Sequence, residues 1–173
     1  MTTETSAAKA RLLEALRASE QRLIDRLSGQ PPEHFEQGAY ESGWNRRQIL
    51  AHVASIEWTY PRLIDLARGV SPAAEKPPEP AASPAPASSA PLRGGINDYN
   101  ERQVEKLADA TVAQLLDLFR ENRARTIAAV EQAEEELFAK EIQSAGGIRG
   151  PLATVIEAIA VHHVAGHLND IAG

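Results

Sequence analysis

The sequence contains no cysteine, and this absence excludes several kinds of site at once. Disulfide bonds, thiolate-bound metals, iron–sulfur clusters and a cysteine nucleophile all require a cysteine sulfur. Any metal ion must therefore be held by nitrogen or oxygen ligands. Any thiol chemistry would likewise need a sulfur atom that arrives with a cofactor.

Aromatic residues and positive charge are also scarce. Aromatic residues make up only 5% of the chain, and 24 acidic residues outnumber 18 basic ones, for a formal net charge of -6. Nucleic-acid-binding domains usually show a basic stripe or aromatic platforms on which bases stack. The sequence shows neither feature, so we expect no nucleic-acid partner.

Long apolar runs are missing as well. No run approaches the roughly 18 residues that would cross a bilayer, and residues 1–10 lack the basic and apolar regions of a signal peptide. We therefore expect no membrane partner and a cytoplasmic location.

Proline is unevenly distributed, with seven of the eleven prolines in residues 71–91. Proline fixes φ and removes a backbone donor, so this stretch should run as an extended connector. Two small domains joined by a linker are one alternative, but each side offers only about two long helices, which is little for an independent core. We predict one domain over residues 1–173, with a flexible linker at about residues 71–95.

Apolar residues recur at helical spacing in four long segments, and no segment shows the alternation of strands over more than a few residues. The sequence predicts an all-α protein, a four-helix bundle whose second and third helices are joined by a long Pro/Ala-rich crossover loop. A shorter helix is expected just after that loop. The four long segments are residues 6–28, 46–69, 112–136 and 151–171.

Local signals set the ends of these helices. Asn45 with Gln48, and Thr111 with Gln114, form capping-box patterns at the starts of the second and third helices. Pro61 interrupts the second helix and predicts a kink or short break just before it.

Three histidines are predicted to point into the bundle. His163 and His167 are four residues apart, so both imidazoles project from one face of the last helix. Helical phase places that face over an apolar stripe, and His52 likewise shares a face with Ile49 and Ile56. Bundle interiors commonly hold metal sites built from facing helices, so the three histidines are a candidate metal triad. Three protein ligands would leave a position open, as in catalytic metal sites.

Other interpretations of these histidines stay open at the level of spacing. A lone inward histidine is more often a hydrogen-bonded core residue than a ligand. His163 and His167 could also interact with the helix dipole when protonated. The dipole does not explain why two of them face an apolar stripe, where an unpaired polar group costs roughly 1 to 3 kcal/mol.

An ordered set of short motifs resembles the DinB/YfiT-like proteins. The set consists of WNRRQILAH at residues 44–52, NDYNER at residues 97–102, and a terminal pair of histidines at 163 and 167 followed by Leu and Ile. Members of that family are four-helix bundles in which one histidine of the second helix and two of the last bind a divalent metal. The resemblance assigns these roles to His52, His163 and His167, with Zn²⁺ or Ni²⁺ as the expected ion. The longer Pro/Ala-rich insert and Pro61 depart from the family pattern.

The resemblance also implies a function. Known family activities are metal-dependent transfers and isomerisations that use a low-molecular-weight thiol such as bacillithiol or mycothiol. We therefore expect a metalloenzyme acting on a small-molecule substrate, either a thiol-dependent S-transferase or a hydrolase in which the ion activates water. The alternative is a non-catalytic metal-binding or stress-associated bundle that acts as a homodimer.

Several residues are candidates to complete such a site. Cations that could hold a carboxylate of substrate or cofactor are Arg102, Arg123 and Arg125, with Asn100 nearby in sequence. Asp170 could orient a metal ligand or accept a hydrogen bond from an inner helix.

Four further residues are expected to lie outside the site. Glu57 is well off the His52 face, and Trp44 is expected to act as a staple at the start of its helix. His34 and His162 are expected at the surface.

Overall fold

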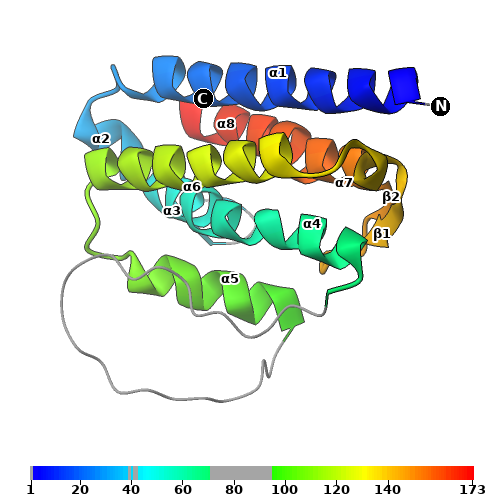
Figure 1. The fold of residues 1–173 in the computed structure, drawn as a ribbon. Coiled ribbons are helices and arrows are strands. Elements are labelled where there is room, and N and C mark those ends of the chain that lie inside the picture. The colour runs from blue at the N-terminus through cyan, green and yellow to red at the C-terminus, as the bar shows by residue number, and fades with distance from the viewer. Residues whose placement is uncertain (1, 39, 41–42, 71–94) are drawn as a thin grey trace.

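The structure is a computed structural model, and it describes residues 2–38, 40, 43–70 and 95–173. Within this part, four long helical stretches lie side by side (Figure 1). This arrangement confirms the predicted bundle. The stretches are α1 (Thr2–Leu27), α3 with α4 (Arg46–Ile56 and Pro61–Arg68), α6 (Val112–Gln132), and α7 with α8 (Leu152–Glu157 and His163–Ala172).

The second stretch is broken where Pro61 predicts it. Helix α3 begins with the expected capping box at Asn45, continues into a 3₁₀ turn, η1 (Glu57–Thr59), and resumes as α4 with Pro61 at its first position. A 3₁₀ turn has about three residues instead of 3.6, so the helix faces shift across it. Leu66, which an unbroken helix would place on the face of His52, is therefore 40% exposed, whereas Ile64 is buried.

A small hairpin follows α6 and was not predicted. The chain passes through the 3₁₀ helix η2 (Glu135–Ala139) into the antiparallel strands β1 (Glu141–Gln143) and β2 (Arg149–Pro151), with Glu141 opposite Pro151. Strands of three residues are too short to show an alternating pattern in the sequence. Pro151 ends β2 and precedes α7, and does not begin the last helix as expected.

The last stretch was predicted as one continuous helix, but a π turn, η3 (Ala158–His162), separates α7 from α8. One series of buried side chains along this stretch recurs at every fourth residue, a wider spacing than the 3.6 residues of an α-helical turn. A π turn contains one more residue than an α turn and absorbs part of this mismatch. The positions of this series are Leu152, Ile156, Ala160, Val164 and Leu168, and Val155 and Ile171 are buried as well.

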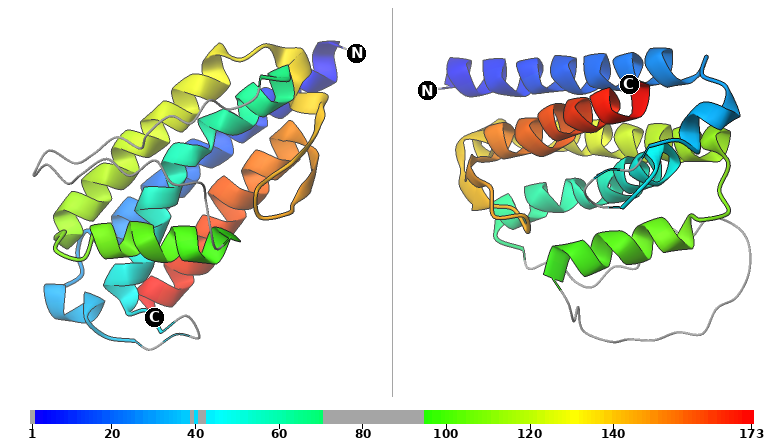
Figure 2. Two further views of the ribbon diagram at one scale, coloured as in Figure 1. Left: turned by 90° about the horizontal axis from the view of Figure 1, so that it is seen from below. Right: turned by 180° about the vertical axis from the view of Figure 1, so that it is seen from behind.

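A shorter helix, α5 (Gly95–Lys106), packs on the outside of α3 (Figures 1 and 2). Because α3–α4 and α6 run in the same direction, the chain between them must return along the bundle, and α5 makes part of that return. It buries Val104, while the one-turn helix α2 (Pro32–Phe35) closes one end of the core with Phe35.

Two expectations concern the remaining chain. The predicted linker falls almost entirely on residues 71–94, which lie outside the described residues. Among the described helices, none combines the length and the apolar character needed to cross a membrane.

Candidate metal centre

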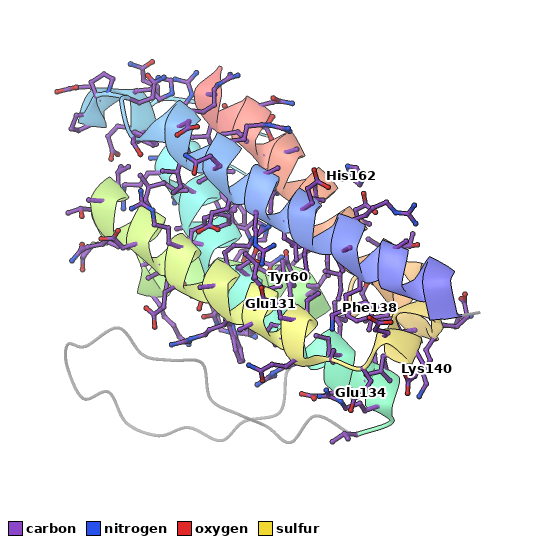
Figure 3. All side chains as sticks on the ribbon, turned by 45° about the horizontal axis from the view of Figure 1, so that its top comes forward. Tyr60, Glu131, Glu134, Phe138, Lys140 and His162 are labelled. Carbon is purple, nitrogen blue, oxygen red and sulfur yellow. The ribbon has the colours of Figure 1, made fainter. Side chains whose placement is uncertain are left out.

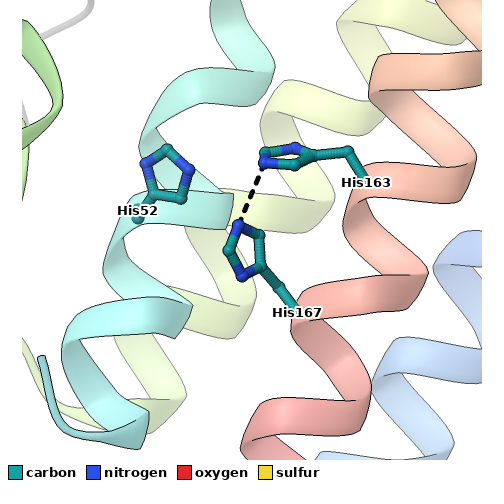
Figure 4. A group of neighbouring side chains, drawn as sticks. All are labelled: His52, His163 and His167. Carbon is teal, nitrogen blue, oxygen red and sulfur yellow. Dashed lines mark hydrogen bonds between the residues drawn. The ribbon is translucent and has the colours of Figure 1, made fainter. Parts of the chain in front are cut away.

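The structure brings the three predicted histidines together between α3 and α8. His52 projects from α3 toward His163 and His167 on α8, and one ring nitrogen from each lies within 4.8 Å of the others. The ring centroid of His52 is 5.6 Å from that of His163 and 5.2 Å from that of His167 (Figure 4).

The geometry fits a metal ion. The Nε2 atoms of His163 and His167 are 3.0 Å apart, and two nitrogen ligands at the usual Zn–N distance in a tetrahedral shell are separated by about 3.3 Å. The Nδ1 atom of His52 is buried and has no hydrogen-bond partner among the described residues. A buried polar atom is costly to leave unpaired. The donor set is therefore nitrogen only, closely spaced and incompletely satisfied within the protein.

The cluster is buried on one side and open on the other. His52 is only 4% exposed, whereas His167 is partly buried and His163 is exposed. Both α8 histidines come one residue before a buried core position, Val164 or Leu168, and so lie at the edge of the core stripe. The prediction that both histidines point straight into the bundle is therefore wrong, because they lie at its rim. This placement leaves a route to solvent beside His163.

Burial keeps the cluster uncharged at neutral pH. Burial, together with the neighbouring His167 and His163, lowers the pKa of His52 to about 3. Burial and the charge of His167 lower the pKa of His163 to about 4, opposed by a hydrogen bond from the His163 ring to the backbone carbonyl of Ile159. Burial also lowers the pKa of His167, and Asp170 opposes that shift. Neutral imidazole is the form that binds metals, so the site is ready to bind at neutral pH.

Two neighbours could support the histidines. The Asp170 Oδ2 atom is 3.5 Å from Nδ1 of His167, one helical turn away, and metal-binding histidines commonly direct their second nitrogen at a carboxylate. The Trp44 ring centroid lies 5.3 Å from that of His52, so Trp44 borders the cluster, and the expectation that it lies outside the site is wrong. Trp44 also lines a cleft of about 240 Å³ between α3 and α5, together with Gln48, Ala51 and Val104 among others.

The predicted cations are differently placed. Arg123 is fully buried and lies 2.8 Å from Glu57 in an ion pair, so it cannot meet a substrate, and that expectation is wrong. Arg125 is largely exposed and pairs with Glu121 on its own helix. Arg102 is exposed and Asn100 partly buried on α5, where their part in binding stays a prediction.

Sequence reasoning missed a buried polar group in the core. Glu57 is off the His52 face as expected, yet it is fully buried, and burial raises its pKa to about 7 while Arg123 opposes the shift. Helical spacing carried a usable signal, because Arg123 follows the buried Phe119 by four residues and precedes the buried Val130 by seven. A buried arginine requires a buried acceptor.

Surface expectations were right for one histidine and wrong for another. His162 lies at the surface as expected, with its side chain 72% exposed (Figure 3). His34 is partly buried, and its Nε2 atom lies 2.6 Å from the carbonyl oxygen of Ile171, which ties α2 to the end of α8.

These features define a class of protein: a helical bundle with an open three-histidine cluster between its second and last long helices. The chain belongs to the DinB superfamily, which it matches over residues 15–171. No curated protein matches its sequence.

Two solved structures share the fold. The crystal structure of a mycothiol-dependent maleylpyruvate isomerase superposes with a TM-score of 0.67 at 18% identity, and a variant of that isomerase with one histidine changed to alanine gives 0.67 at 17%. Each alignment covers 94% of this chain, which spans 60% of the isomerase chain. At such low identity the likeness concerns the fold.

Proposed function

We propose that His52, His163 and His167 bind a divalent metal ion, Zn²⁺ or Ni²⁺, and that the protein is a metalloenzyme acting on a small molecule with a thiol cofactor. The observation that carries this proposal is the convergence of three ring nitrogens within 4.8 Å from two helices far apart in sequence. Membership of the DinB superfamily supports it.

The chain's own residues have distinct parts in this proposal. His52 anchors the site from the interior, and the two α8 histidines complete it at the rim. A bound ion would supply Lewis acidity, which lowers the pKa of a coordinated thiol or water. Trp44 lies beside the His52 ring and also lines the cleft between α3 and α5, where the organic part of a ligand can lie.

A thiol cofactor is favoured for a chemical reason. The protein has no cysteine, so a sulfur nucleophile must be brought to the site. A protein of the same fold is named for its dependence on mycothiol. We infer a transfer or isomerisation that uses a low-molecular-weight thiol. A hydrolase is the second candidate, because the exposed side of His163 also admits water.

Metal content tests the first half of the proposal. Elemental analysis after incubation with Zn²⁺ or Ni²⁺ should find close to one ion per chain, and His52→Ala or His163→Ala should lose it. His162→Ala is the matched control, since His162 is adjacent to His163 but faces solvent. Metal-free wild-type protein, or equal loading of all four proteins, would refute the triad.

Turnover of a model electrophile tests the second half. The thiol-dependent enzyme should require both the metal and an added thiol such as mycothiol. Turnover with metal and no thiol would identify a hydrolase. Full metal loading without turnover of thiol-reactive or hydrolysable substrates would favour a non-catalytic metal-binding bundle.

A further inference from the structure

The π turn η3 lies directly before the metal-site histidines, and His163 is the first residue of α8. The N–H group of His163 bonds to the carbonyl of Ala158, five residues back, in place of the Ile159 carbonyl that an α-helix would use. One extra residue in the turn changes the rotation of the following helix by roughly 100°.

Both halves of the last stretch depend on that rotation. One buried series runs through Leu152 and Ile156 on α7, Ala160 in η3, and Val164 and Leu168 on α8, each four residues after the previous one. In an uninterrupted α-helix every such step drifts by about 40°, which accumulates to about 160° over the four steps. Without the π turn, α7 could not keep its core contacts while His163 and His167 face His52.

Side chains from other helices bind the carbonyls of the π turn. The Tyr60 hydroxyl donates to the carbonyl of Ile159 at 3.1 Å, and Nη2 of Arg123 donates to the carbonyl of Ala160 at 2.7 Å. Burial raises the pKa of the Tyr60 hydroxyl well above its usual range, so the hydroxyl keeps the proton that it donates. The carbonyl that His163 leaves without its α-helical partner is thereby satisfied by Tyr60.

Glu57 holds the Arg123 guanidinium in place through an ion pair. Its carboxylate contacts Arg123 twice, at 2.8 Å to Nε and 3.0 Å to Nη2, and neither side chain is exposed. The guanidinium also donates to the carbonyl of Leu16 on α1 at 3.2 Å. Arg123 therefore links the break in the second helix, where Glu57 and Tyr60 lie, to the π turn in the last helix.

We propose that Tyr60, Arg123 and Glu57 are positioning residues for the metal centre. They stabilise the π turn and so hold the rotation that directs His163 and His167 toward His52. This inference rests on the metal binding proposed above. It assigns to the metal centre three supporting residues that contact neither the metal nor the substrate.

Tyr60→Phe is the mildest test, because it removes a single hydroxyl. We expect Zn²⁺ affinity, measured by competition with a chromophoric chelator, to fall about 10-fold, as is usual when support of a metal ligand is lost. The absorption spectrum of the Co²⁺-substituted protein should change with it. Tyr99→Phe is the control. It also removes a single hydroxyl, which lies on α5 and accepts a hydrogen bond from the Trp58 Nε1–H group. It should leave the Zn²⁺ affinity and the Co²⁺ spectrum unchanged.

Arg123→Lys extends the test by keeping the charge while removing the guanidinium fork that reaches Glu57 and Ala160 together. It should weaken Zn²⁺ binding at least as much as Tyr60→Phe. If Arg123→Lys does not fold, Tyr60→Phe decides alone. Wild-type affinity and an unchanged Co²⁺ spectrum in Tyr60→Phe would overturn the inference.

Amide hydrogen exchange in the metal-free protein separates this inference from the proposed function. Exchange at residues 160–163 should be faster in Tyr60→Phe than in the wild type or Tyr99→Phe. If the wild type binds no metal, the proposed function fails. Unchanged exchange in Tyr60→Phe would then overturn the role of Tyr60 in holding the π turn, and faster exchange would support it.

Discussion

Within the histidine cluster, burial differs sharply from one residue to the next. His52 is almost fully buried and leaves Nδ1 without a partner among the described residues, while His163 is exposed. A buried unsatisfied nitrogen costs about 1 to 3 kcal/mol. In a core whose only role is stability, such a nitrogen beside two further imidazoles would be unfavourable. In a metal-binding site, the bound ion would compensate for this cost.

Asp170 gives a prediction at this scale. Its carboxylate is close enough to attract the Nδ1–H group of His167 and to favour the tautomer whose Nε2 atom faces the other histidines. Asp170→Asn should weaken Zn²⁺ binding by about 10-fold, measured by competition titration.

The control for Asp170 is Asp117→Asn, which breaks an ion pair of the same three-residue spacing on the surface of α6. It should leave the affinity unchanged. Equal affinities for the wild type and both variants would show that Asp170 does not support His167.

Single residues also show what sequence reasoning could and could not reach. Spacing and face analysis selected His52, His163 and His167 as a group because helical phase is a local property. The role of Arg123 was misassigned, because its partner Glu57 is 66 residues away and only the packing of α6 against η1 reveals the pair.

Among the helices and strands, features with a local cause were predictable. Both capping boxes and the break at Pro61 follow from side chains within a few residues of the backbone groups that they satisfy. The π turn has a tertiary cause, since Tyr60 and Arg123 reach it from other helices. The hairpin was missed because each strand is only three residues long.

The cap of α3 can be tested directly. Asn45 accepts a hydrogen bond from the Gln48 N–H group at 2.9 Å, and its own N–H group donates to the Gln48 side chain at 2.9 Å. Asn45→Ala removes the acceptor and should lower the free energy of unfolding by about 1 kcal/mol in urea titration.

Asn45→Asp retains a cap acceptor and should stay close to the wild type. Thr111→Ala provides an independent comparison, because it removes the equivalent capping box of α6 and should cost a similar amount. A wild-type free energy of unfolding for Asn45→Ala would contradict the capping role.

For the molecule as a whole, folding stability should depend on the charge state of the buried cluster. The folded state holds the pKa of His52 at about 3, against an ordinary value of 6.5. Below pH 6.5 the unfolded chain therefore binds a proton that the folded protein excludes. This contribution is fully present above pH 6.5 and is lost progressively as the pH falls toward 3.

The metal-free protein should accordingly lose about 2 kcal/mol of unfolding free energy between pH 6.5 and 5 from His52 alone, at 1.36 kcal/mol per pH unit. Urea unfolding at a series of pH values in the presence of a chelator measures this slope. His52→Gln should make the slope shallower, because glutamine does not titrate and only the shifted His163 and His167 remain in the cluster. His162→Ala should retain the wild-type slope because His162 is exposed in the folded state. A slope in His52→Gln as steep as in the wild type would assign the acid sensitivity to other groups and would mean that His52 is not held neutral by burial.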